Sequence, residues 1–382
     1  MKVVMLLGRS TGGIGTHVAD LSADLRDLGV DVIVVTHPLT VSRFDLGPVR
    51  LWWPGSAGWV RALRDVRMLR RLASTADIVH AHGHQGALLA TLSTLGIRVP
   101  RKRPKLIVSQ HNAILASSGR QELKRLAQRW VARHADLVTG ASSDLVEEAL
   151  AFGAARVELA EVPSPRVPGL LAQRPADRPT RDRIRQALIS VLAPDVSVLA
   201  PDAVDFTEPL VVTISRIAPQ KNLPVLVEAA SLLDNACTWV VLGDGDPELL
   251  AQLQGQARAL GVHVHFVGAR SDADEWLRAA EVFVLPSEWE ARALVVQEAM
   301  AAGTPVVATD VGGLHDLVAG TGLLVIPRDP DAIARATDRV LAEPRLRADL
   351  AARGREVAKA LPDGRDTASR WLERYAETLL MT

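Results

Sequence analysis

Short apolar runs alternate with amphipathic segments along this chain, and the alternation occurs twice. Buried-type strands that alternate with helices predict a parallel sheet covered by helices on both faces. In the first half the predicted strands are 3–7, 31–37, 49–53, 77–82, 105–111, 136–142 and 156–162. In the second half they are 209–215, 238–245, 264–268, 281–286, 305–310 and 323–327. The sequence therefore predicts two similar α/β halves in tandem.

A stretch rich in proline and arginine, residues 163–183, separates the two series, and the near-duplicated segment 192–204 follows it. A chain of 382 residues is too long for one ordinary core. We therefore expect two domains joined by a linker region, with a small-molecule site in the cleft between the two sheets. The apolar spacing of residues 367–380 predicts a last amphipathic helix.

The net charge is zero, but the two halves differ in sign. Residues 1–200 hold 27 Lys and Arg against 17 Asp and Glu, and residues 201–382 hold the reverse. A basic half favours an acidic partner such as membrane headgroups, phosphorylated lipids or nucleic acid. No nucleic-acid recognition motif accompanies the charge, so nucleic acid is the least favoured of these partners.

The remaining bulk features predict a soluble, cytoplasmic protein. The single cysteine, Cys237, excludes an internal disulfide framework and fits a reducing compartment. The opening residues MKVVMLLGRS are interpreted as a first strand and not as a signal peptide. No uncharged apolar run approaches the roughly 18 residues that a membrane span requires.

Two glutamates, Glu290 and Glu298, lie in the most informative segment. The first follows an apolar strand on a polar loop, and a helix is predicted to start near Leu294 with Glu298 about one turn inside it. Ligands of open α/β sheets bind at such strand ends, and the amides at a helix start attract anions such as a diphosphate. A carboxylate accepts from two neighbouring hydroxyls at once, as ribose or a hexose presents them. The combination indicates a nucleotide sugar.

Glutamate also favours the first turns of helices, so for this pair alone two solvated surface carboxylates are the favoured interpretation. The neighbouring motifs favour the functional interpretation. The next predicted strand runs directly into Gly312-Gly313.

A glycine-rich turn follows the first predicted strand and contains Gly8, Gly12, Gly13 and Gly15. Glycines free the backbone for a tight turn and for close approach to a ligand. The turn is not a P-loop, because Ile14 stands where the lysine belongs, and its spacing does not fit a dinucleotide fingerprint. A purely structural turn is the alternative.

The second series of strands opens with two cations, Arg216 and Lys221, at the end of its first strand. Two cations at that position are suited to hold a diphosphate leaving group and to stabilise the charge that grows on it. The alternative is two solvated loop cations.

Together these residues resemble the retaining glycosyltransferases of family four, which have the two-domain GT-B fold. Four pieces match in order: the glycine turn at 12–13, SRxxxxK at 215–221, the glutamate pair, and EAMAAGTPVVATDVGGL at 298–314. The resemblance implies two Rossmann-like domains that face a central cleft. The expected boundaries are an acceptor-binding domain at 1–165, a linker region at 166–206, a nucleotide-sugar-binding domain at 207–360, and a helix at 361–382 that crosses back to the first domain.

The resemblance also implies a role for individual residues. Arg216 and Lys221 bind the donor diphosphate, Glu298 the donor ribose, and Glu290 the hydroxyls of the transferred sugar. His111, at the end of the fifth predicted strand, falls where the family has a histidine facing the reacting sugar. The expected catalytic residues are His111, Glu290, Arg216 and Lys221. The expected donor-binding residues are Gly12, Gly13, Arg216, Lys221, Arg270, Glu290, Ala291, Arg292, Ala293, Leu294 and Glu298. The family requires no metal and no cofactor beyond the nucleoside diphosphate sugar.

This chain departs from the family pattern at three places. The usual Gly-Phe-Gly after the first glutamate is replaced by Ala291-Arg292-Ala293, which restricts the loop whose amides meet the diphosphate. His315 and Asp316 stand where a proline and a glutamate are usual. The Asn-Gly turn before the linker is replaced by PSPRVPG. These departures leave the predicted reaction class unchanged, but they weaken any prediction of the substrate.

Two further patterns resemble metal sites. His80, His82 and His84 alternate and would share one face of an extended strand, but the strand is expected to end at Gly83, so residues lining the cleft are the favoured interpretation. Two Asp-x-Asp pairs mimic a metal motif and are interpreted as a turn and a helix cap. These are Asp244/Asp246 and Asp272/Asp274.

Basic clusters occur at 61–73, 98–105 and 120–134. The first and third have apolar residues between the cations at helical spacing, as interfacial helices do, whereas an arginine-rich soluble surface is the alternative. Peripheral contact with an anionic membrane is the prediction. Trp52, Trp53 and Trp59 lie near the first cluster, and core packing is the default for them.

The sequence thus predicts a retaining, metal-independent transferase that moves a hexose from a nucleoside diphosphate sugar to a hydroxyl. The acceptor is a glycan, glycolipid or small molecule, and a lipid-linked or cell-envelope glycan precursor is the specific expectation. A nucleotide-sugar epimerase or a phosphorylase of the same fold is the main alternative. A catalytically inactive sugar-nucleotide-binding protein is a third, and a nicotinamide-dependent oxidoreductase is the weakest.

Overall fold

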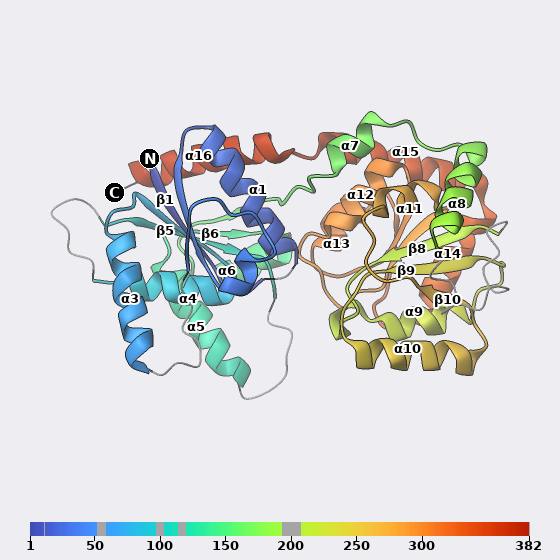
Figure 1. The fold of residues 1–382 in the computed structure, drawn as a ribbon, viewed down its shortest axis with the longest axis horizontal. Helices are drawn as coiled ribbons and strands as arrows, with labels where there is room; N and C mark the ends of the chain where they lie inside the picture. Colours follow the sequence, from blue (N-terminus) through green and yellow to red (C-terminus); the bar gives the residue numbers. More distant parts are fainter. Residues whose placement is uncertain (11, 52–58, 97–102, 114–119, 193–207, 382) are drawn as a thin grey trace. The chain divides into compact units, whose positions relative to one another are not determined.

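The computed structural model describes residues 1–10, 12–51, 59–96, 103–113, 120–192 and 208–381. The chain divides into two compact units (Figure 1). Unit 1 comprises Met1–Pro165 and Pro362–Thr382, and unit 2 comprises Arg166–Leu361. Each unit is a parallel sheet with helices on both faces, as the alternating pattern predicts.

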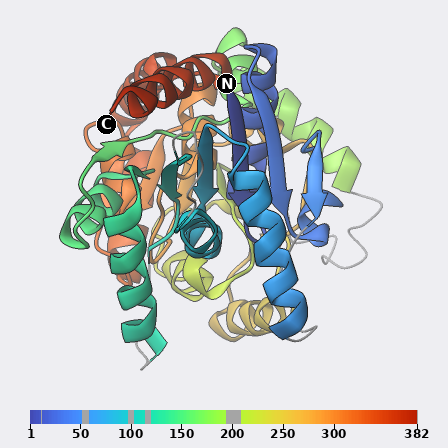
Figure 2. The same ribbon diagram turned by 90° about the vertical axis from the view of Figure 1, so that its left-hand side faces the viewer.

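Unit 1 contains a seven-stranded sheet in the order β3-β2-β1-β4-β5-β6-β7. The strands are β1 (Lys2–Leu7), β2 (Asp31–Thr36), β3 (Val49–Leu51), β4 (Ile78–His82), β5 (Lys105–Gln110), β6 (Leu137–Gly140) and β7 (Val157–Leu159). The helices are α1 (Gly13–Asp27), α2 (Pro38–Val41), α3 (Trp59–Ala73), α4 (Gly83–Thr94), α5 (Arg120–His134), α6 (Ser143–Ala151) and α16 (Gly364–Leu380). Figure 2, which turns this unit toward the viewer, shows helices on both sides of the sheet.

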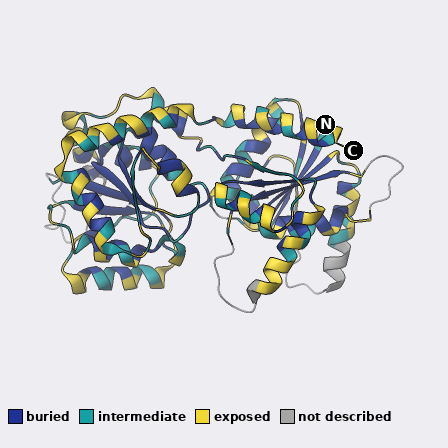
Figure 3. Ribbon diagram, turned by 180° about the vertical axis from the view of Figure 1, so that it is seen from behind, coloured by how far each residue is buried: buried dark blue, intermediate teal, exposed yellow. Residues whose placement is uncertain are grey.

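The sequence of β1 explains why both faces are covered. Its alternate residues Val3, Met5 and Leu7 belong to one buried apolar cluster, whereas Val4 and Leu6 belong to another. Successive side chains of a strand point to opposite faces, so an uninterrupted apolar run requires a core on each side. The strands are accordingly buried and the outer helix faces exposed (Figure 3).

Unit 2 repeats this plan with a six-stranded sheet in the order β10-β9-β8-β11-β12-β13. The strands are β8 (Leu210–Ile214), β9 (Thr238–Leu242), β10 (Val264–Phe266), β11 (Val282–Leu285), β12 (Val306–Thr309) and β13 (Leu323–Val325). The helices are α7 (Val167–Ala172), α8 (Arg178–Leu192), the 3₁₀ helix η1 (Pro219–Lys221), α9 (Leu223–Ala230), α10 (Pro247–Leu260), α11 (Ala273–Ala279), α12 (Leu294–Ala302), α13 (Gly313–Val318), α14 (Pro330–Ala342) and α15 (Pro344–Ala360). Every strand predicted from the sequence is present.

The range 166–206, predicted as a linker, supplies α7 and α8 to unit 2. Arg185 of α8 is buried, forms an ion pair with Glu281 and donates to the carbonyl of Ala279. Such a cation is tolerated inside a fold only because a carboxylate neutralises it, and composition alone does not reveal that partner. Residues 193–207, which include most of the near-duplicated segment, lie outside the described residues.

The last helix, α16, packs against the first sheet. Trp371 and Tyr375 are fully buried among apolar side chains of β1, β2 and α1. The Tyr375 hydroxyl lies 2.7 Å from Nδ1 of His80 on β4. Unit 1 is therefore built from two distant parts of the sequence.

Both sheets reverse their strand order at one point. In unit 1 the reversal lies between β1 and β4, and in unit 2 between β8 and β11. Connections leave these neighbouring strands toward opposite faces, which opens a crevice at their carboxyl ends. The predicted site residues follow these strands or their neighbours in both units, except Arg270, which follows β10 at the edge of the second sheet.

Candidate active site

The loop after β8 presents the two predicted cations. Arg216 directly follows Ser215 and is exposed, and its guanidinium forms no ion pair with any residue that the structure describes. Lys221 is the last residue of η1. The next residue, Asn222, adopts a left-handed conformation with φ 50° and is the N-cap residue of α9. A short 3₁₀ turn therefore aims the lysine back across the carboxyl edge of the sheet.

Glu290 lies on the loop after β11 and is 8 % exposed. One of its carboxylate oxygens, Oε1, forms an ion pair with the Lys221 ammonium and accepts a hydrogen bond of 2.6 Å from the Ser287 hydroxyl. The strand-reversal point thus joins one predicted cation directly to one predicted carboxylate. A positioned carboxylate that retains a second oxygen is suited to accept from sugar hydroxyls.

The Gly312-Gly313 motif holds this glutamate loop in place. The Gly313 amide donates to the Glu290 carbonyl at 2.8 Å. Gly312 has φ +49°, and a Cβ there would lie 2.3 Å from the same carbonyl oxygen and 2.7 Å from Nε1 of Trp289. The contact excludes a larger residue, so the glycines after β12 serve the geometry of Glu290.

Gln220 fastens the loop from the other side. Its side-chain Nε2 donates to the Trp289 carbonyl at 2.7 Å, and its backbone carbonyl accepts from the Glu288 amide at 2.8 Å. The loops after β8 and β11 are thereby tied through backbone groups as well as through the ion pair. Such ties fix a site before its ligand arrives.

Glu298 occupies the second turn of α12, which begins at Leu294 as predicted, and is 9 % exposed. Ala291 and Ala293 are buried, and Arg292 is partly buried. Ala293 precedes the helix with φ −72° and ψ 98°, a conformation open to any residue. Glycine is therefore not needed there, which explains how this loop accommodates its departure from Gly-Phe-Gly.

Arg270 follows β10 and is paired with Asp272 at 2.7 Å. The hydrogen bond from Arg270 is the main cause that lowers the pKa of the Asp272 carboxyl. Asp272 stands just before α11, but its side chain makes no capping hydrogen bond, contrary to the predicted cap. Asp274 pairs with Arg166 at 3.1 Å.

The other Asp-x-Asp pair lies in the predicted turn and also supplies a helix cap that was not predicted. Asp246 caps α10 by accepting from the amides of Glu248 and Leu249, and Asp244 accepts from the Ala269 amide at 3.0 Å in the turn. The adjacent glycines allow a close approach of two loops. A Cβ on Gly243 would lie 1.9 Å from the Ser215 carbonyl oxygen, beside Arg216.

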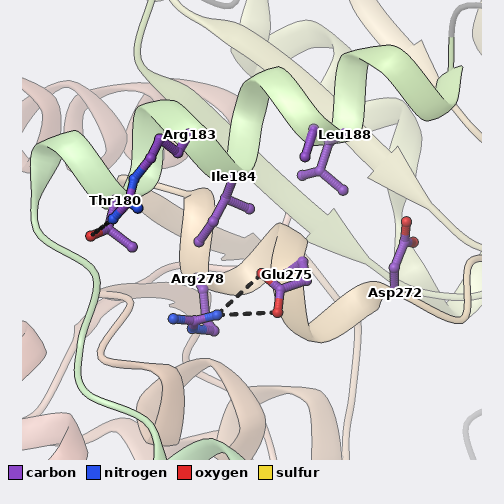
Figure 4. Close-up of a pocket in the computed structure, with 8 residues that line it drawn as sticks. Thr180, Arg183, Ile184, Leu188, Asp272, Glu275 and Arg278 are labelled. Atoms are coloured by element: carbon purple, nitrogen blue, oxygen red, sulfur yellow. Dashed lines mark hydrogen bonds and ion pairs between the residues drawn. The ribbon is translucent and has the colours of Figure 1, made fainter.

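A pocket of about 470 Å³ lies between α8 and α11 (Figure 4). Its lining residues are Thr180, Arg183, Ile184, Ala187, Leu188, Asp272, Glu275 and Arg278. None of them is a predicted site residue, although Asp272 pairs with Arg270. The pocket is therefore a separate feature from the cluster around Glu290.

In unit 1, Gly12 and Gly13 form the start of α1. Gly12 has an extended conformation and its carbonyl accepts from the Gly15 amide at 2.8 Å. This places free helix-start amides at the carboxyl end of β1, the geometry that attracts anions.

His111 follows β5 and is buried. Its Nε2 lies 3.1 Å from Nδ1 of His82, and the two rings are stacked with centroids 5.4 Å apart. Burial, followed by the neighbouring His17 and His84, lowers the pKa of His111 to about 3. The ring is therefore neutral at physiological pH.

The three alternating histidines do not form one cluster, although the rings of His80 and His82 lie 4.1 Å apart. Gly83 ends β4 with φ +72°, as predicted, and the histidines take different partners. His80 contacts Tyr375 and the Ser109 hydroxyl, His82 contacts His111, and His84 contacts Gln128 of α5. They line the carboxyl edge of the sheet without forming one site.

Two participants were not identified from the sequence. His17 lies on α1 beside His82 and His111, with ring centroids 5.8 and 5.4 Å away. Ser287 bonds Glu290 and is itself fixed by Thr309, which donates to its carbonyl at 2.6 Å. The only signal for His17 was its place one helical turn after Gly13, and Ser287 gave none.

Known proteins resemble this chain along most of its length. The family described as Glycosyl transferases group 1 matches residues 201–357, and the Glycosyl transferase 4-like domain matches residues 12–165. D-inositol 3-phosphate glycosyltransferase 2 of Catenulispora acidiphila is 30 % identical over 383 residues, covering 89 % of this chain and 84 % of the relative. Alpha-D-kanosaminyltransferase of Streptomyces kanamyceticus is 30 % identical over 334 residues, covering 83 % and 79 %.

A solved structure shares the fold. The Anabaena protein Alr3699/HepE, in complex with UDP and glucose, superposes with a TM-score of 0.79 at 20 % identity, covering 99 % of this chain and all of that one. The two domain matches, the full-length relatives and the shared architecture agree with one another. The chain belongs to the family-four glycosyltransferases and is a hexosyltransferase with the GT-B fold.

Proposed function

We propose that this enzyme moves a hexose from a nucleoside diphosphate sugar to a hydroxyl acceptor, with retention at the anomeric carbon and without a metal. The observation that carries the proposal is the Lys221–Glu290 ion pair at the strand-reversal point of unit 2, with Arg216 exposed on the same loop as Lys221. One carboxylate for hydroxyls and two cations for a diphosphate are the groups that such a donor requires.

In the proposed donor complex, Arg216 and Lys221 hold the diphosphate. Glu298 accepts from the ribose hydroxyls, and Glu290 accepts from hydroxyls of the sugar. Arg270 and the α12 amides from Leu294 onward complete the site. The Anabaena relative binds UDP and glucose, so UDP-glucose is the first donor to test.

The proposed reaction breaks the bond between the anomeric carbon and the diphosphate oxygen, and the diphosphate leaves with the electron pair. The two cations stabilise the negative charge that grows on it. The acceptor oxygen bonds the same face of the carbon and loses its proton to an oxygen of the leaving diphosphate. His111, neutral at physiological pH, faces the reacting sugar as a hydrogen-bonding group.

The acceptor is proposed to be a lipid-linked or cell-envelope glycan precursor, on the evidence of α5. Leu123 and Leu126 are 71 % and 56 % exposed, and the cations Lys124, Arg125 and Arg129 are exposed around them. Apolar side chains between cations on one helix suit an anionic membrane surface. No helix among the described residues is long and apolar enough to cross a membrane.

The other basic clusters add less to this proposal. The side chains of residues 61–64 and of Trp59 lie outside the described residues, as do Trp52, Trp53 and residues 97–102. A soluble phosphorylated acceptor is the second candidate, favoured by the name of the inositol phosphate relative.

The test is a screen of UDP-, GDP- and ADP-hexoses in excess chelator, with labelled sugar and product analysis by NMR. We expect nucleoside diphosphate release, transfer of label to a hydroxyl and an unchanged anomeric configuration. An epimerised donor indicates an epimerase, a sugar phosphate indicates a phosphorylase, and no nucleotide binding in calorimetry indicates an inactive protein. Loss of all turnover in chelator would contradict metal independence.

Membrane contact is tested by sedimentation with anionic and neutral liposomes at low salt. We expect retention on anionic liposomes only, weakened when Leu123 and Leu126 are replaced by glutamine. A protein that stays in the supernatant with anionic lipid would favour the soluble acceptor.

A further inference from the structure

Three imidazoles meet at the carboxyl edge of the first sheet. His17 comes from α1, His82 is the last residue of β4, and His111 follows β5. One ring nitrogen of each lies within 4.8 Å of the others. The three residues are 5 %, 1 % and 8 % exposed.

Hydrogen bonding leaves this cluster incomplete. His82 Nδ1 and His111 Nε2 share one hydrogen bond of 3.1 Å. His82 Nε2 is buried and has no hydrogen-bond partner among the residues that the structure describes. A buried polar atom without a partner is costly, and an unfilled ligand position is one of its few explanations in a folded protein.

The neighbouring histidines make other hydrogen bonds, although Nε2 of His84, like that of His82, is buried without a hydrogen-bond partner among the residues that the structure describes. Both ring nitrogens of His80 are engaged, by Tyr375 and by Ser109, and Nδ1 of His84 is engaged by Gln128. The rings of His80 and His82 also lie 4.1 Å apart, but the ring nitrogens that converge within 4.8 Å of one another are those of His17, His82 and His111.

The ligand type also fits a metal ion, because imidazole nitrogens are common ligands of Zn²⁺. Neutral imidazoles keep a lone pair for coordination at pH 7.

We propose that His17, His82 and His111 form a three-imidazole site for a divalent transition-metal ion of the Zn²⁺ type. Tetrahedral Zn²⁺ with bonds of about 2.0–2.1 Å holds its nitrogens about 3.3 Å apart. The ring nitrogens of the three histidines lie within 4.8 Å of one another, so side-chain rotation is needed to bring them to that spacing around an ion. Nitrogen ligands without a carboxylate select such ions over Mg²⁺ or Ca²⁺.

The bound ion is regulatory and not part of the transfer. The ion coordinates His111, whose ring the proposed function assigns to hydrogen bonding with the reacting sugar. His111 is then not available to the sugar, so the ion inhibits the enzyme. This second step rests on the proposed function, whereas metal binding itself does not.

Binding is tested by titrating Co²⁺ into the chelator-treated full chain and recording its visible absorption, which needs no nucleotide sugar. We expect one Co²⁺ per chain with the intense bands of tetrahedral coordination. Affinity falls at least tenfold in His17→Gln and in His82→Gln, and stays unchanged in His263→Gln, where an exposed histidine of unit 2 is removed. Circular dichroism verifies that each variant is folded.

Three results would overturn the site. The first is that the wild type binds no Co²⁺, and the second is that His17→Gln and His82→Gln bind Co²⁺ as tightly as the wild type. The third is a sulfur-to-cobalt charge-transfer band, which would assign the ion to Cys237. The wild-type titration is decisive even if the variants fail to fold.

Inhibition is tested by the ratio of turnover with and without Zn²⁺ in wild type and in His17→Gln. We expect a wild-type ratio well below one, restored by chelator, and a ratio near one in the variant. If Zn²⁺ binds the three histidines but does not lower wild-type turnover, the proposed inhibition through His111 is wrong. A chain that transfers no sugar from any donor overturns the proposed function, while the Co²⁺ titration still decides the site.

Discussion

Lys221, after β8, forms an ion pair with Glu290, after β11, across the strand-reversal point of the second sheet. The pair keeps the carboxylate in place together with Ser287 and compensates the lysine charge while the site is empty. Arg216 forms no ion pair with any residue in the described part of the chain. In the proposed donor complex, the diphosphate therefore meets Arg216 first and then competes with Glu290 for Lys221.

Lys221→Met is expected to lower kcat by about 10²–10³-fold, the usual cost of losing one stabilising donor in a transition state. The fold remains intact, because Ser287 still bonds Glu290. Steady-state kinetics measure the effect. Lys359→Met, which removes a surface cation paired with Glu356, serves as the control and should change kcat by less than about twofold. Near wild-type turnover in Lys221→Met would falsify the site assignment.

Glu298→Ala is expected to abolish transfer by removing the acceptor of the ribose hydroxyls. The specific test compares calorimetric binding of UDP with that of 2′,3′-dideoxy-UDP. The wild type should prefer UDP by about tenfold or more, because its carboxylate needs the hydroxyls, whereas the variant should bind both alike. An undiminished preference for UDP in the variant would place the ribose elsewhere.

Gly312→Ala is expected to displace the glutamate loop, because its Cβ would lie 2.3 Å from the Glu290 carbonyl oxygen. Gly320→Ala is a matched control with φ +78° and no atom within 4 Å of the added Cβ. Both variants carry the backbone strain of about 1 kcal/mol that a positive φ imposes on alanine. Only Gly312→Ala should lose donor affinity and turnover. Equal activities of the two variants would show that the loop contact is unimportant.

Unit 1 is expected to lose stability as the pH falls from 7 to 5. The folded pKa values of His17 and His111, about 4 and about 3, lie below the unfolded value of about 6.5. Between these values the unfolded chain binds more protons, so each histidine removes up to about 1.4 kcal/mol of stability per pH unit as pH decreases.

Urea unfolding at pH 7 and pH 5 measures this loss. Asp20 and Asp24, whose pKa values burial raises, act in the opposite direction near pH 4, so the comparison stays above pH 5. His17→Gln should reduce the pH dependence and His263→Gln should not. Equal wild-type stability at the two pH values contradicts the neutral state of the cluster.

Tyr375 is the only tyrosine of the chain and reports on alkaline unfolding. Burial raises the pKa of its hydroxyl far above the usual value of about 10. The folded state therefore keeps the proton, and the stability that it contributes is present below pH 10 and is lost as the pH rises further. We expect tyrosinate absorbance to appear only together with the loss of helical circular dichroism. Ionisation near pH 10 in the folded protein would contradict this burial.

The strands were predictable because each is an apolar run bounded by polar or glycine residues. Val3–Leu7, for example, needs no partner to be identified as a buried strand. The positions of Arg216, Lys221, Glu290 and Glu298 were predictable for the same reason, since strand ends locate them. Their roles in donor binding stay predictions.

Contacts between distant residues were not predictable. Arg185 makes α8 part of unit 2 through Glu281, which is 96 residues away. His17 joins His82 and His111 only because β1, β4 and β5 are neighbours in the sheet. Local sequence carries propensity and periodicity, whereas such pairs depend on the strand order that the tertiary fold creates.

The hydrogen bond between Tyr375 and His80 has a consequence for synthesis on the ribosome. Unit 2 is continuous in sequence, so it can fold as soon as Leu361 has emerged. Synthesis of unit 1 begins first, but its folding is completed last. Its core and the buried His80 stay uncovered until α16 leaves the ribosome, because Trp371 and Tyr375 of that helix pack over them. The nascent chain must therefore hold an open first sheet while the whole second unit is translated. A chain that stops before α16 should depend on chaperones for as long as it exists.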